Sequence, residues 1–479
     1  MTRREDVDVC VIGSGAGGSV VAWEAARRGL RTLVIERGPY VRPADLTHSE
    51  LEMIPHLYKD GGLQLNTSMD MFIMQGSCVG GSTVISNMVL LRAPDAVFAT
   101  WRGLGADVST DAMRAAYDEV EEKLGACAPP DDVVSRTSHL FMQGARAIGR
   151  DPQWMKKSLG DCRGCGNCNV GCTFGTKRDA LSTYIRWAED AGARVLADTN
   201  VDAIEHRSGR VTRLRCTTGR RREPLEVRAR QVVVAAGAVG SSALLLASGI
   251  RRNVGTRLSF NAGAMMIADF AEPLDSYDAD QMSVYLEGDG WCIEATHNPI
   301  MSTALTTPGW LGEHGALVRR QRHLAFAGAL VATEPVGRVV QSPVWGHEET
   351  RYTATPRDVA RLKDGLRTIA ESFFAAGAKR IVLPTHRVQT LASARELDRV
   401  SSCFTSTREI SFGTAHPQGG NPLSDDPDLG AVRSDFSVHG FDNLFVADAS
   451  LFPSCIGVNP IDTIMALATI ASRRILARA

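Results

Sequence analysis

A glycine-rich turn near the start of the chain has the residue types and spacing of a dinucleotide-binding site. Gly13, Gly15 and Gly18 form a Gly-x-Gly-x-x-Gly string, and Glu36 follows at the end of the next apolar run. Glycines permit a tight turn and a close approach of the backbone to a pyrophosphate, while the following helix directs its N-terminus at the phosphates and the acid can hold a ribose hydroxyl. We therefore predict a bound dinucleotide, and both NAD and FAD satisfy this pattern.

Four cysteines in a short loop have the spacing of a bacterial ferredoxin run. Cys162, Cys165, Cys168 and Cys172 follow one another with two, two and three residues between them, and Thr173 stands where a ferredoxin usually has proline. The spacing leaves three options: an iron–sulfur cluster, a structural zinc ion, or a reduced thiol-rich loop without metal. The other cysteines are scattered, and because no secretion signal is recognisable, we expect them to be reduced thiols.

The last third of the chain holds three more polar strings that could serve chemistry. His416 precedes Pro417, Asp448 lies in a short turn after an apolar run, and Asn459 precedes Pro460. The pattern after Pro460 predicts a helix that reaches residue 474, with Asn459 as its N-cap and Pro460 at its first helical position.

The elements around these residues predict an α/β fold. Apolar runs at residues 7–12 and 31–35 indicate two strands, with a helix between them at residues 20–28. Further strands are expected at residues 194–196, 211–216 and 231–235, and further helices at residues 111–124, 183–191, 239–247 and 356–376. Residues 255–379 show mixed alternation, which suits an antiparallel sheet with insertions.

Length and charge narrow the class of protein. A chain of 479 residues favours two packed domains. Its 53 basic and 54 acidic residues nearly cancel, so nothing points to a nucleic acid or an anionic membrane as the main partner. The uncharged stretch at residues 231–250 contains several glycines and predicts a strand, a turn and a helix rather than a membrane span. We expect a cytoplasmic protein with a small, mostly uncharged substrate.

Several of these blocks, taken in order, resemble the glucose–methanol–choline (GMC) oxidoreductase family. The glycine turn continues through Glu36 to Gly38, a second glycine-rich loop at residues 76–83 leads to Arg92, and residues 232–246 are similar to the family's second strand–turn–helix at the flavin. The string at residues 457–460 is most similar to cholesterol-oxidase-like members. The cysteine loop is similar to that of some flavin alcohol or sugar dehydrogenases and of long-chain alcohol oxidases. The resemblance implies FAD rather than NAD.

The resemblance also implies which residues hold the cofactors. FAD is expected to be bound without a covalent link. The residues implied to contact it are Gly13, Gly15, Gly18, Glu36, Gly80, Gly81, Ser82, Asn87, Ala236, Asp448, Asn459 and Pro460. An iron–sulfur cluster, where present, would be held by Cys162, Cys165, Cys168 and Cys172.

The implied reaction is the oxidation of an alcohol to an aldehyde or ketone. His416 matches the family's active-site histidine, and an imidazole is suited to accept the hydroxyl proton while a hydride passes to flavin N5. Asn459 matches the second catalytic position, where its amide can orient the alcohol oxygen. The helix that follows would direct its positive end at the reduced flavin. Oxygen or a redox partner would then take up the electrons.

Two alternatives to this reaction remain open at the sequence level. One is a GMC-like lyase in which the flavin is structural, and the other is a dehydrogenase that passes electrons through an iron–sulfur cluster to a protein or quinone. The fold implied is a Rossmann-like FAD-binding domain intertwined with an α+β substrate-binding domain that carries a mainly antiparallel sheet. The FAD-binding domain is expected in three parts, at residues 1–100, 196–258 and 431–479. A connecting region at residues 101–195 holds the cysteine loop at 162–172. The substrate-binding domain is expected at residues 259–430.

Overall fold

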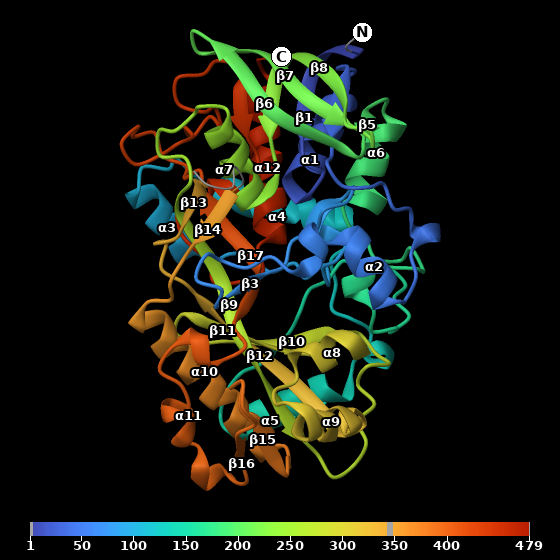
Figure 1. Cartoon of the computed structure of the whole chain (residues 1–479), viewed down its shortest axis with the longest axis vertical. Coiled ribbons are helices and arrows are strands. Elements are labelled where there is room, and N and C mark those ends of the chain that lie inside the picture. Colours follow the sequence, from blue (N-terminus) through green and yellow to red (C-terminus); the bar gives the residue numbers. More distant parts are fainter. Residues whose placement is uncertain (1–2, 343–347, 479) are drawn as a thin grey trace.

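Two sheets, one in each half of the molecule, organise the chain. The computed structural model describes residues 3–342 and 348–478. A seven-stranded sheet lies in the upper half of Figure 1 and a nine-stranded sheet in the lower half, with helices around both. This mixed arrangement confirms the predicted α/β fold class.

The first sheet is the Rossmann-like part of the fold. Its order is β5-β2-β1-β8-β7-β6, with β18 paired to β8. β1 pairs in parallel with β2 and β8, whereas β7 pairs in antiparallel fashion with β6 and β8. The strands are β1 (Arg3–Ile12), β2 (Thr32–Ile35), β5 (Arg194–Leu196), β6 (Thr199–Arg207), β7 (Arg210–Thr218), β8 (Glu223–Val234) and β18 (Leu444–Val446). The chain therefore enters this sheet in three separate stretches, while the predicted domain limits stay a prediction.

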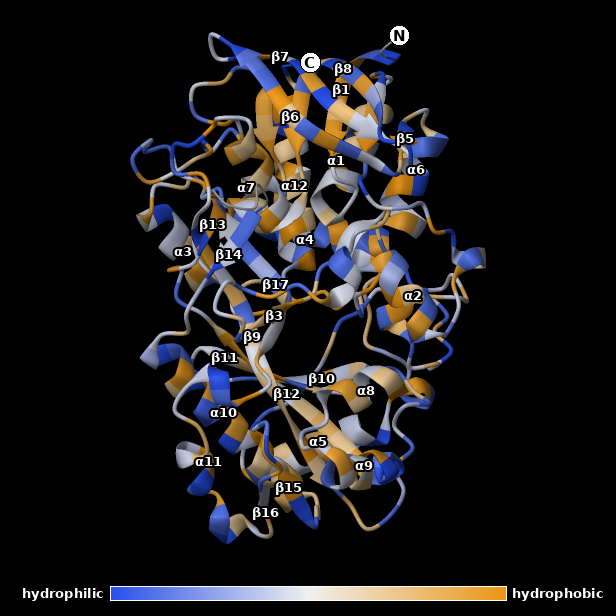
Figure 2. Cartoon of the chain, viewed as in Figure 1, coloured by the Kyte–Doolittle hydropathy of each residue, from blue (hydrophilic) through white to orange (hydrophobic). Residues whose placement is uncertain are grey.

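Helices with apolar faces cover the first sheet. They are α1 (Ala16–Ala26), α4 (Thr110–Leu124), α6 (Arg186–Asp190), α7 (Gly237–Ala247) and α12 (Ile461–Leu476). α12 packs on both α1 and α4, and Figure 2 shows the apolar colouring of α7 and α12 beside the strands. α1 begins at Ala16, earlier than predicted, because the helix starts directly from the glycine turn. The helix predicted at residues 183–191 begins as a π-helix, Leu181–Ile185, and continues as α6.

The second sheet is mainly antiparallel, as the alternation at residues 255–379 predicted. Its order is β16-β15-β9-β12-β11-β10-β4, and β17 pairs with both β9 and β3. The strands are β3 (Phe72–Ile73), β4 (Gln153–Trp154), β9 (Thr256–Asp269), β10 (Met282–Glu287), β11 (Trp291–Thr296), β12 (Leu324–Ala332), β15 (Arg380–Val382), β16 (Thr390–Leu391) and β17 (Gly413–Gly420). β9 is the long central strand, so it connects β17 with the rest of the sheet.

One face of the second sheet is covered by α10 (Pro356–Ala375) and α5 (Arg136–Ala147). α10 starts with a capping box, in which Thr355 Oγ1 accepts from the Asp358 backbone N–H and Asp358 accepts from the Thr355 N–H. Gly365 lets α10 approach the Ala329 side chain on β12. The side chains that alternate with Ala329 along the strands therefore face the other way, toward the first sheet.

Shorter elements complete the described chain. They are α2 (Glu50–Leu57), α3 (Asp95–Gly103), α8 (Ile300–Thr306), α9 (Leu311–Arg319), α11 (Arg399–Ser402), β13 (Arg338–Gln341) and β14 (Glu348–Arg351). α2 and α8 touch through Glu50, whose carboxylate accepts from the Met301 and Ser302 backbone N–H groups at 2.6 and 2.9 Å. Within the described residues, no helix is both long and apolar enough to cross a bilayer.

Candidate active site

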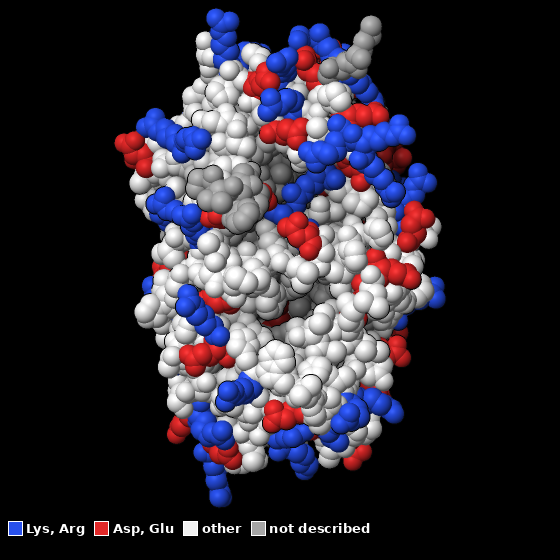
Figure 3. All heavy atoms as spheres, viewed as in Figure 1, with Lys and Arg blue, Asp and Glu red and all other residues white. Residues whose placement is uncertain are grey.

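A cavity of about 1090 Å³ lies between the two sheets. Its walls come from the carboxyl ends of β1 and β2, from β17, and from the face of the second sheet opposite α10. Carboxyl ends of parallel strands are where open α/β sheets bind ligands. Figure 3 shows this face of the molecule hollowed near its middle, with mainly uncharged residues below the hollow and to its right. The two ends of the cavity differ in chemistry.

The first glycine turn forms one end of the cavity. Gly13 and Gly15 line the cavity, as does Glu36. Glu36 Oε2 accepts from the Ser14 backbone N–H at 3.1 Å and from Ser14 Oγ at 2.8 Å, so the acid is tied to the turn. Gly18 does not line the cavity; a Cβ there would lie 2.1 Å from the Gly13 carbonyl oxygen, so this glycine lets α1 pack on the turn. The ribose contact of Glu36 stays a prediction.

The second glycine-rich loop lies against the first. Gly80 and Gly81 have φ angles of 93° and 57°, in the left-handed region that favours glycine. The Gly80 N–H donates to Ser14 Oγ at 3.0 Å, and a Cβ on Gly81 would lie 2.9 Å from the Gly15 Cα. Gly81 lines the cavity, whereas Gly80 does not. The two glycine loops therefore form one continuous backbone wall.

Ser82 and Asn87 extend this wall along the cavity. Ser82 Oγ accepts from the Gly76 N–H at 2.9 Å, which closes the loop on itself. Asn87 Nδ2 donates to Asn169 Oδ1 at 3.3 Å, while Asn87 Oδ1 is buried without a partner.

The start of α7 contributes the next part of the wall. Ala236 precedes the helix and lines the cavity together with Asp448. Asp448 Oδ2 accepts from the Gly237 N–H at 2.8 Å and from Ser241 Oγ at 2.5 Å, so this carboxylate caps the helix. Burial raises the pKa of Asp448, and its four hydrogen-bond contacts act against that rise.

The open backbone of these loops fits a dinucleotide. A Cβ on Gly237 would meet no atom within 4 Å, and a Cβ on Gly15 would reach only the Gly81 Cα at 4.0 Å, although both glycines line the cavity. Side chains at either position would fill space that a cofactor needs. Ala16 of α1 and Ile461 of α12 also line the cavity, so two further helix N-termini direct partial positive charge toward it. The donor set suits the pyrophosphate and the electron-accepting ring of FAD.

The two predicted catalytic side chains lie together at the other end of the cavity. His416 stands on β17 and Asn459 just before α12, and Asn459 Nδ2 lies 3.4 Å from His416 Nε2. Burial lowers the pKa of His416 to about 4, so its imidazole is neutral at neutral pH. His416 Nδ1 and Asn459 Oδ1 are buried and have no hydrogen-bond partner in the described structure. Such unpaired groups are rare in proteins and indicate a ligand site.

The predicted N-cap role of Asn459 is wrong. α12 begins at Ile461 with Pro460 as its N-cap, and no side chain caps the helix. The Asn459 amide is instead turned toward His416. Because the first turn of α12 keeps its N–H groups free of side-chain caps, Pro460 and Ile461 present that helix end to the cavity.

Glu294 is a candidate site residue that the sequence did not reveal. It lies on β11, lines the same cavity, and its Oε1 is buried without a partner. Burial raises the pKa of Glu294 to about 7, while a hydrogen bond with the Asn459 side chain and the positive charge of Lys157 act in the opposite direction. One signal was present in the sequence, because Glu294 is the single charged residue in the otherwise uncharged run Trp291–Thr296.

The second sheet positions the loop that carries Asn459. Asn261 faces His416 across the β9–β17 pair. Asn261 Nδ2 donates to the Val458 carbonyl at 2.5 Å, and Cys455 Sγ donates to Asn261 Oδ1 at 2.8 Å. These bonds hold the residues before Asn459 against the strand next to His416, so a single sheet sets the separation of the two side chains.

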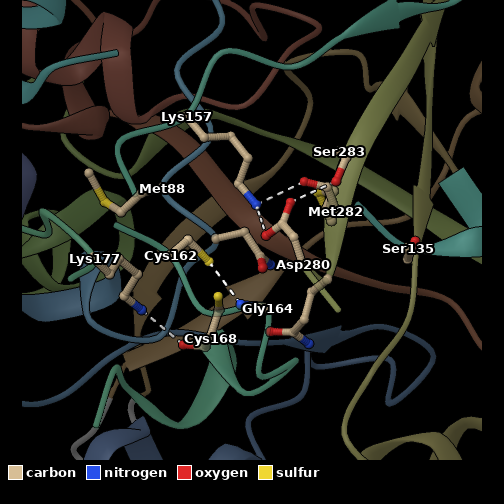
Figure 4. A network of polar contacts seen from close by, with 12 residues as sticks. Met88, Ser135, Lys157, Cys162, Gly164, Cys168, Lys177, Asp280, Met282 and Ser283 are labelled. Carbon is tan, nitrogen blue, oxygen red and sulfur yellow. Dashed lines mark hydrogen bonds and ion pairs between the residues drawn. The ribbon is translucent and has the colours of Figure 1, made fainter. Parts of the chain in front are cut away.

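The cysteine loop braces the opposite cavity wall. Lys177 Nζ donates to the carbonyls of Val84, Ser86 and Cys168 at 2.6, 2.9 and 2.9 Å, which links this loop to the second glycine-rich loop. Figure 4 shows Lys177 reaching Cys168 beside the buried ion pair of Lys157 and Asp280, whose charged atoms are 2.5 Å apart. The loop therefore supports the wall that contains Asn87.

The four cysteines share one small pocket, and their pKa shifts differ. Cys162, Cys165, Cys168 and Cys172 all line it. Burial raises the pKa of Cys168 to about 12, whereas backbone and side-chain bonds from Lys177 and Thr176 outweigh burial and lower the pKa of Cys172. Among the residues that the structure describes, no three or more His, Cys, Asp or Glu side chains are arranged to hold a metal ion. The structure thus gives no support to the iron–sulfur or zinc option.

Comparisons with known proteins identify the family of the chain. Residues 54–262 and 337–468 each match a family described as GMC oxidoreductase, and residues 11–50 match an NAD(P)-binding Rossmann-like domain. The chain is 31% identical to an uncharacterized GMC-type oxidoreductase of Mycobacterium tuberculosis over 98% of its own length and 76% of that protein. It is 26% identical to a long-chain-alcohol oxidase of Arabidopsis thaliana over 99% of its length and 67% of the relative.

A solved structure shares the whole fold. The crystal structure of pyridoxine 4-oxidase from Mesorbium loti matches with a TM-score of 0.77 at 17% identity, covering 98% of this chain and 99% of the other.

Proposed function

The chain belongs to the GMC oxidoreductase family, whose members are FAD-dependent oxidoreductases acting on CH–OH donors, and we propose that it oxidises an alcohol to an aldehyde or a ketone. One observation carries this proposal. The His416 imidazole and the Asn459 amide lie 3.4 Å apart, and they do so in the same cavity that reaches the glycine turn and Glu36. A proton acceptor and a hydrogen-bond donor therefore meet beside a nucleotide cradle.

His416 supplies the base for the hydroxyl proton. Since its pKa is lowered to about 4, the imidazole is unprotonated and can accept a proton at neutral pH. An alcohol oxygen seated between the two side chains would lose its proton to the imidazole and accept a hydrogen bond from Asn459 Nδ2. The amide does not titrate, so it keeps the oxygen in place on both sides of the proton transfer.

Glu294 serves as a positioning residue for the amide. Its carboxyl lies beside the Asn459 side chain in the cavity, where it favours one orientation of the amide. The uncapped first turn of α12 adds a positive field near Asn459 that favours negative charge nearby. FAD, when bound there without a covalent link, supplies the acceptor for the hydrogen and electron pair that leave the alcohol carbon.

Anaerobic spectroscopy of the FAD-loaded enzyme tests the proposal. A panel of primary and secondary alcohols is added without oxygen, and the flavin absorbance is followed. We expect at least one alcohol to bleach the flavin. A flavin that stays oxidised while the alcohol is nevertheless consumed would indicate a lyase and overturn the proposal.

Readmission of oxygen to the same sample identifies the acceptor class. Fast return of the flavin colour together with peroxide would make oxygen the acceptor. A flavin that stays reduced in oxygen and recovers with a quinone or a redox protein would make the chain a dehydrogenase. An iron assay on the same preparation tests whether the four cysteines hold a cluster.

A further inference from the structure

The outer part of the cavity has a chemistry of its own. We define the apolar basin as Phe72 of β3, Met265 and Ile267 of β9, Met301 of α8, and Leu330 of β12, all of which line the cavity. Met265 and Ile267 alternate along β9, and Leu330 stands on the neighbouring strand β12, so the same sheet face that carries Glu294 also carries these side chains.

Charged groups of the cavity lie elsewhere or are already paired. Glu36 and Asp448 belong to the nucleotide end, where both accept backbone N–H bonds. Lys59 Nζ forms an ion pair with Glu348 at 2.5 Å. Glu294 is the charged side chain at the boundary, where it meets Asn459. Arg37, next to Glu36, also lines the cavity, and its Nε donates to Ser77 Oγ at 3.3 Å. None of these charged residues belongs to the apolar basin.

Hydroxyls on the basin side donate their hydrogens to the protein. Thr306 Oγ1 donates to the Ser302 carbonyl at 2.9 Å, Ser302 Oγ donates to Glu50 at 2.5 Å, and Thr414 Oγ1 donates to the Asn261 carbonyl at 2.7 Å. By contrast, the partnerless buried atoms of His416, Asn459 and Glu294 gather at one place. Apart from Asn87 Oδ1, the unpaired buried atoms of these cavity residues therefore lie at the end where the hydroxyl would bind.

The mouth of the basin is apolar as well. We define the apolar rim as Leu63, Leu65 and Leu305, which line the cavity although they are 83%, 44% and 75% exposed. Water-exposed apolar side chains around a cavity mark a binding surface for apolar matter. The flexible side chains of Met265 and Met301 can adapt their shape to alkyl chains of different forms. A chain that outgrows the basin would leave through this rim.

We propose that the substrate is an alcohol with a single polar head and an extended apolar body, held in the apolar basin with its far end at the apolar rim. This inference rests on the proposed function, because the hydroxyl must sit at His416 and Asn459. A sugar or another polyol would bury several hydroxyls among the apolar side chains of the basin, where the Asn298 amide, now in contact with Met265 Sδ, could meet few of them, and the unpaired hydroxyls would cost binding.

Binding of tertiary alcohols tests the substrate class without any oxidation. A tertiary alcohol keeps the hydroxyl but has no hydrogen on the carbinol carbon, so it cannot be oxidised. Calorimetric titration of the FAD-loaded enzyme with tertiary alcohols that carry one alkyl chain of increasing length should lower Kd about fourfold per added methylene. A second hydroxyl near the middle of the chain, where it would lie in the apolar basin, should raise Kd about tenfold. Kd values that do not change with chain length, or equal binding of the two series, would overturn the inference.

Two leucines provide a matched pair of variants. Leu305→Ser removes a rim side chain of α8 that lines the cavity, while Leu311→Ser changes a 93% exposed side chain at the start of α9 that does not line it. We expect Leu305→Ser to weaken the longest alcohols about fivefold and to leave the shortest unchanged, with Leu311→Ser like the parent throughout. Because both positions are on the surface, loss of folding does not obscure the comparison. Equal losses of affinity for the longest alcohols in both variants would show that the apolar rim does not contact the alkyl chain.

The two proposals fail in different ways. If tertiary alcohols bind with the expected chain-length dependence but no primary or secondary alcohol bleaches the flavin, the oxidation fails and the substrate class stands. If a polyol bleaches the flavin as fast as an apolar alcohol of equal size, the oxidation stands and the substrate class fails.

Discussion

The two ends of the cavity differ in whether their polar atoms have hydrogen-bond partners within the protein. At the nucleotide end, Glu36 is bonded to Ser14, and Ser14 in turn is bonded to Gly80. At the reaction end, His416 Nδ1, Asn459 Oδ1 and Glu294 Oε1 are buried without partners. Satisfied polar groups make a rigid cradle, whereas unsatisfied ones cost free energy that a ligand can recover. The nucleotide end is therefore built as a scaffold, whereas the reaction end keeps polar atoms available for chemistry.

Removal of the base should give the largest effect on the reaction end. His416→Gln keeps a polar side chain but removes the proton acceptor, so the rate of flavin reduction by alcohol should fall by roughly 10²–10⁴-fold. Rapid-mixing spectroscopy under anaerobic conditions measures this rate, and the FAD content of the variant serves as the control. A reduction rate within about threefold of the parent would show that His416 is not the base.

The buried carboxyl of Glu294 should make stability depend on pH. Its folded pKa of about 7 lies above the ordinary value of 4.5, so the folded chain binds more protons than the unfolded chain between these values. Stability should therefore fall as pH rises from 4.5 to 7. Glu294→Gln cannot ionise, and it should gain about 3 kcal/mol over the parent across this window. Denaturant unfolding of both proteins at pH 5 and pH 8 measures the gain. If the stabilities of the two proteins changed in parallel with pH, the raised pKa of Glu294 would be refuted.

The amide at Asn459 should contribute less than the base but act on the same step. Asn459→Leu keeps the approximate volume and removes the hydrogen bond to the alcohol oxygen, so flavin reduction should slow by about 10–100-fold. The readout is kcat and KM measured separately, because loss of orientation lowers kcat, whereas loss of simple binding raises KM. An Asn459→Asp variant that matches the parent would argue against a donor role.

At the nucleotide end, a single hydroxyl should influence stability. Ser14→Ala removes the hydroxyl that donates to Glu36 and accepts from the Gly80 N–H. We expect a loss of about 2 kcal/mol in the free energy of unfolding, since a buried N–H and a carboxylate each lose a partner. Urea unfolding with and without added FAD measures it. No change in either condition would mean that the two glycine loops hold together without Ser14.

The nucleotide end could be predicted from the sequence because its geometry is local. Gly13, Gly15 and Glu36 lie within one strand–turn–helix–strand unit, and the backbone preferences of glycine act over neighbouring residues. The strands β2, β5 and β7 and the long helices α4 and α10 were predicted within two residues for the same reason, whereas β8 begins eight residues before its predicted start and β6 was not predicted. The identity and order of the His416 and Asn459 strings also lay in the sequence.

The reaction end could not be predicted in full because it depends on pairing between distant strands. Glu294 enters the cavity only because β11 pairs with β12 and exposes alternate residues to the first sheet. Asn459 departed from its predicted cap role because the β9–β17 pair places His416 within 3.4 Å of its amide. The cysteine spacing left three options open, with an iron–sulfur cluster ahead of zinc, because spacing alone does not specify where four sulfur atoms point.

By itself, the sequence indicated the glycine turn, several strands and helices of the FAD-binding part, and the family. Only the tertiary structure decided that Glu294 joins the site, that polar atoms at one end stay unpaired, and that a basin of apolar side chains extends from them to the surface. The physical reason is that the conformation of a turn is set by the torsion angles of adjacent residues. The shape of a cavity and its unpaired hydrogen-bonding atoms depend instead on which distant strands become neighbours.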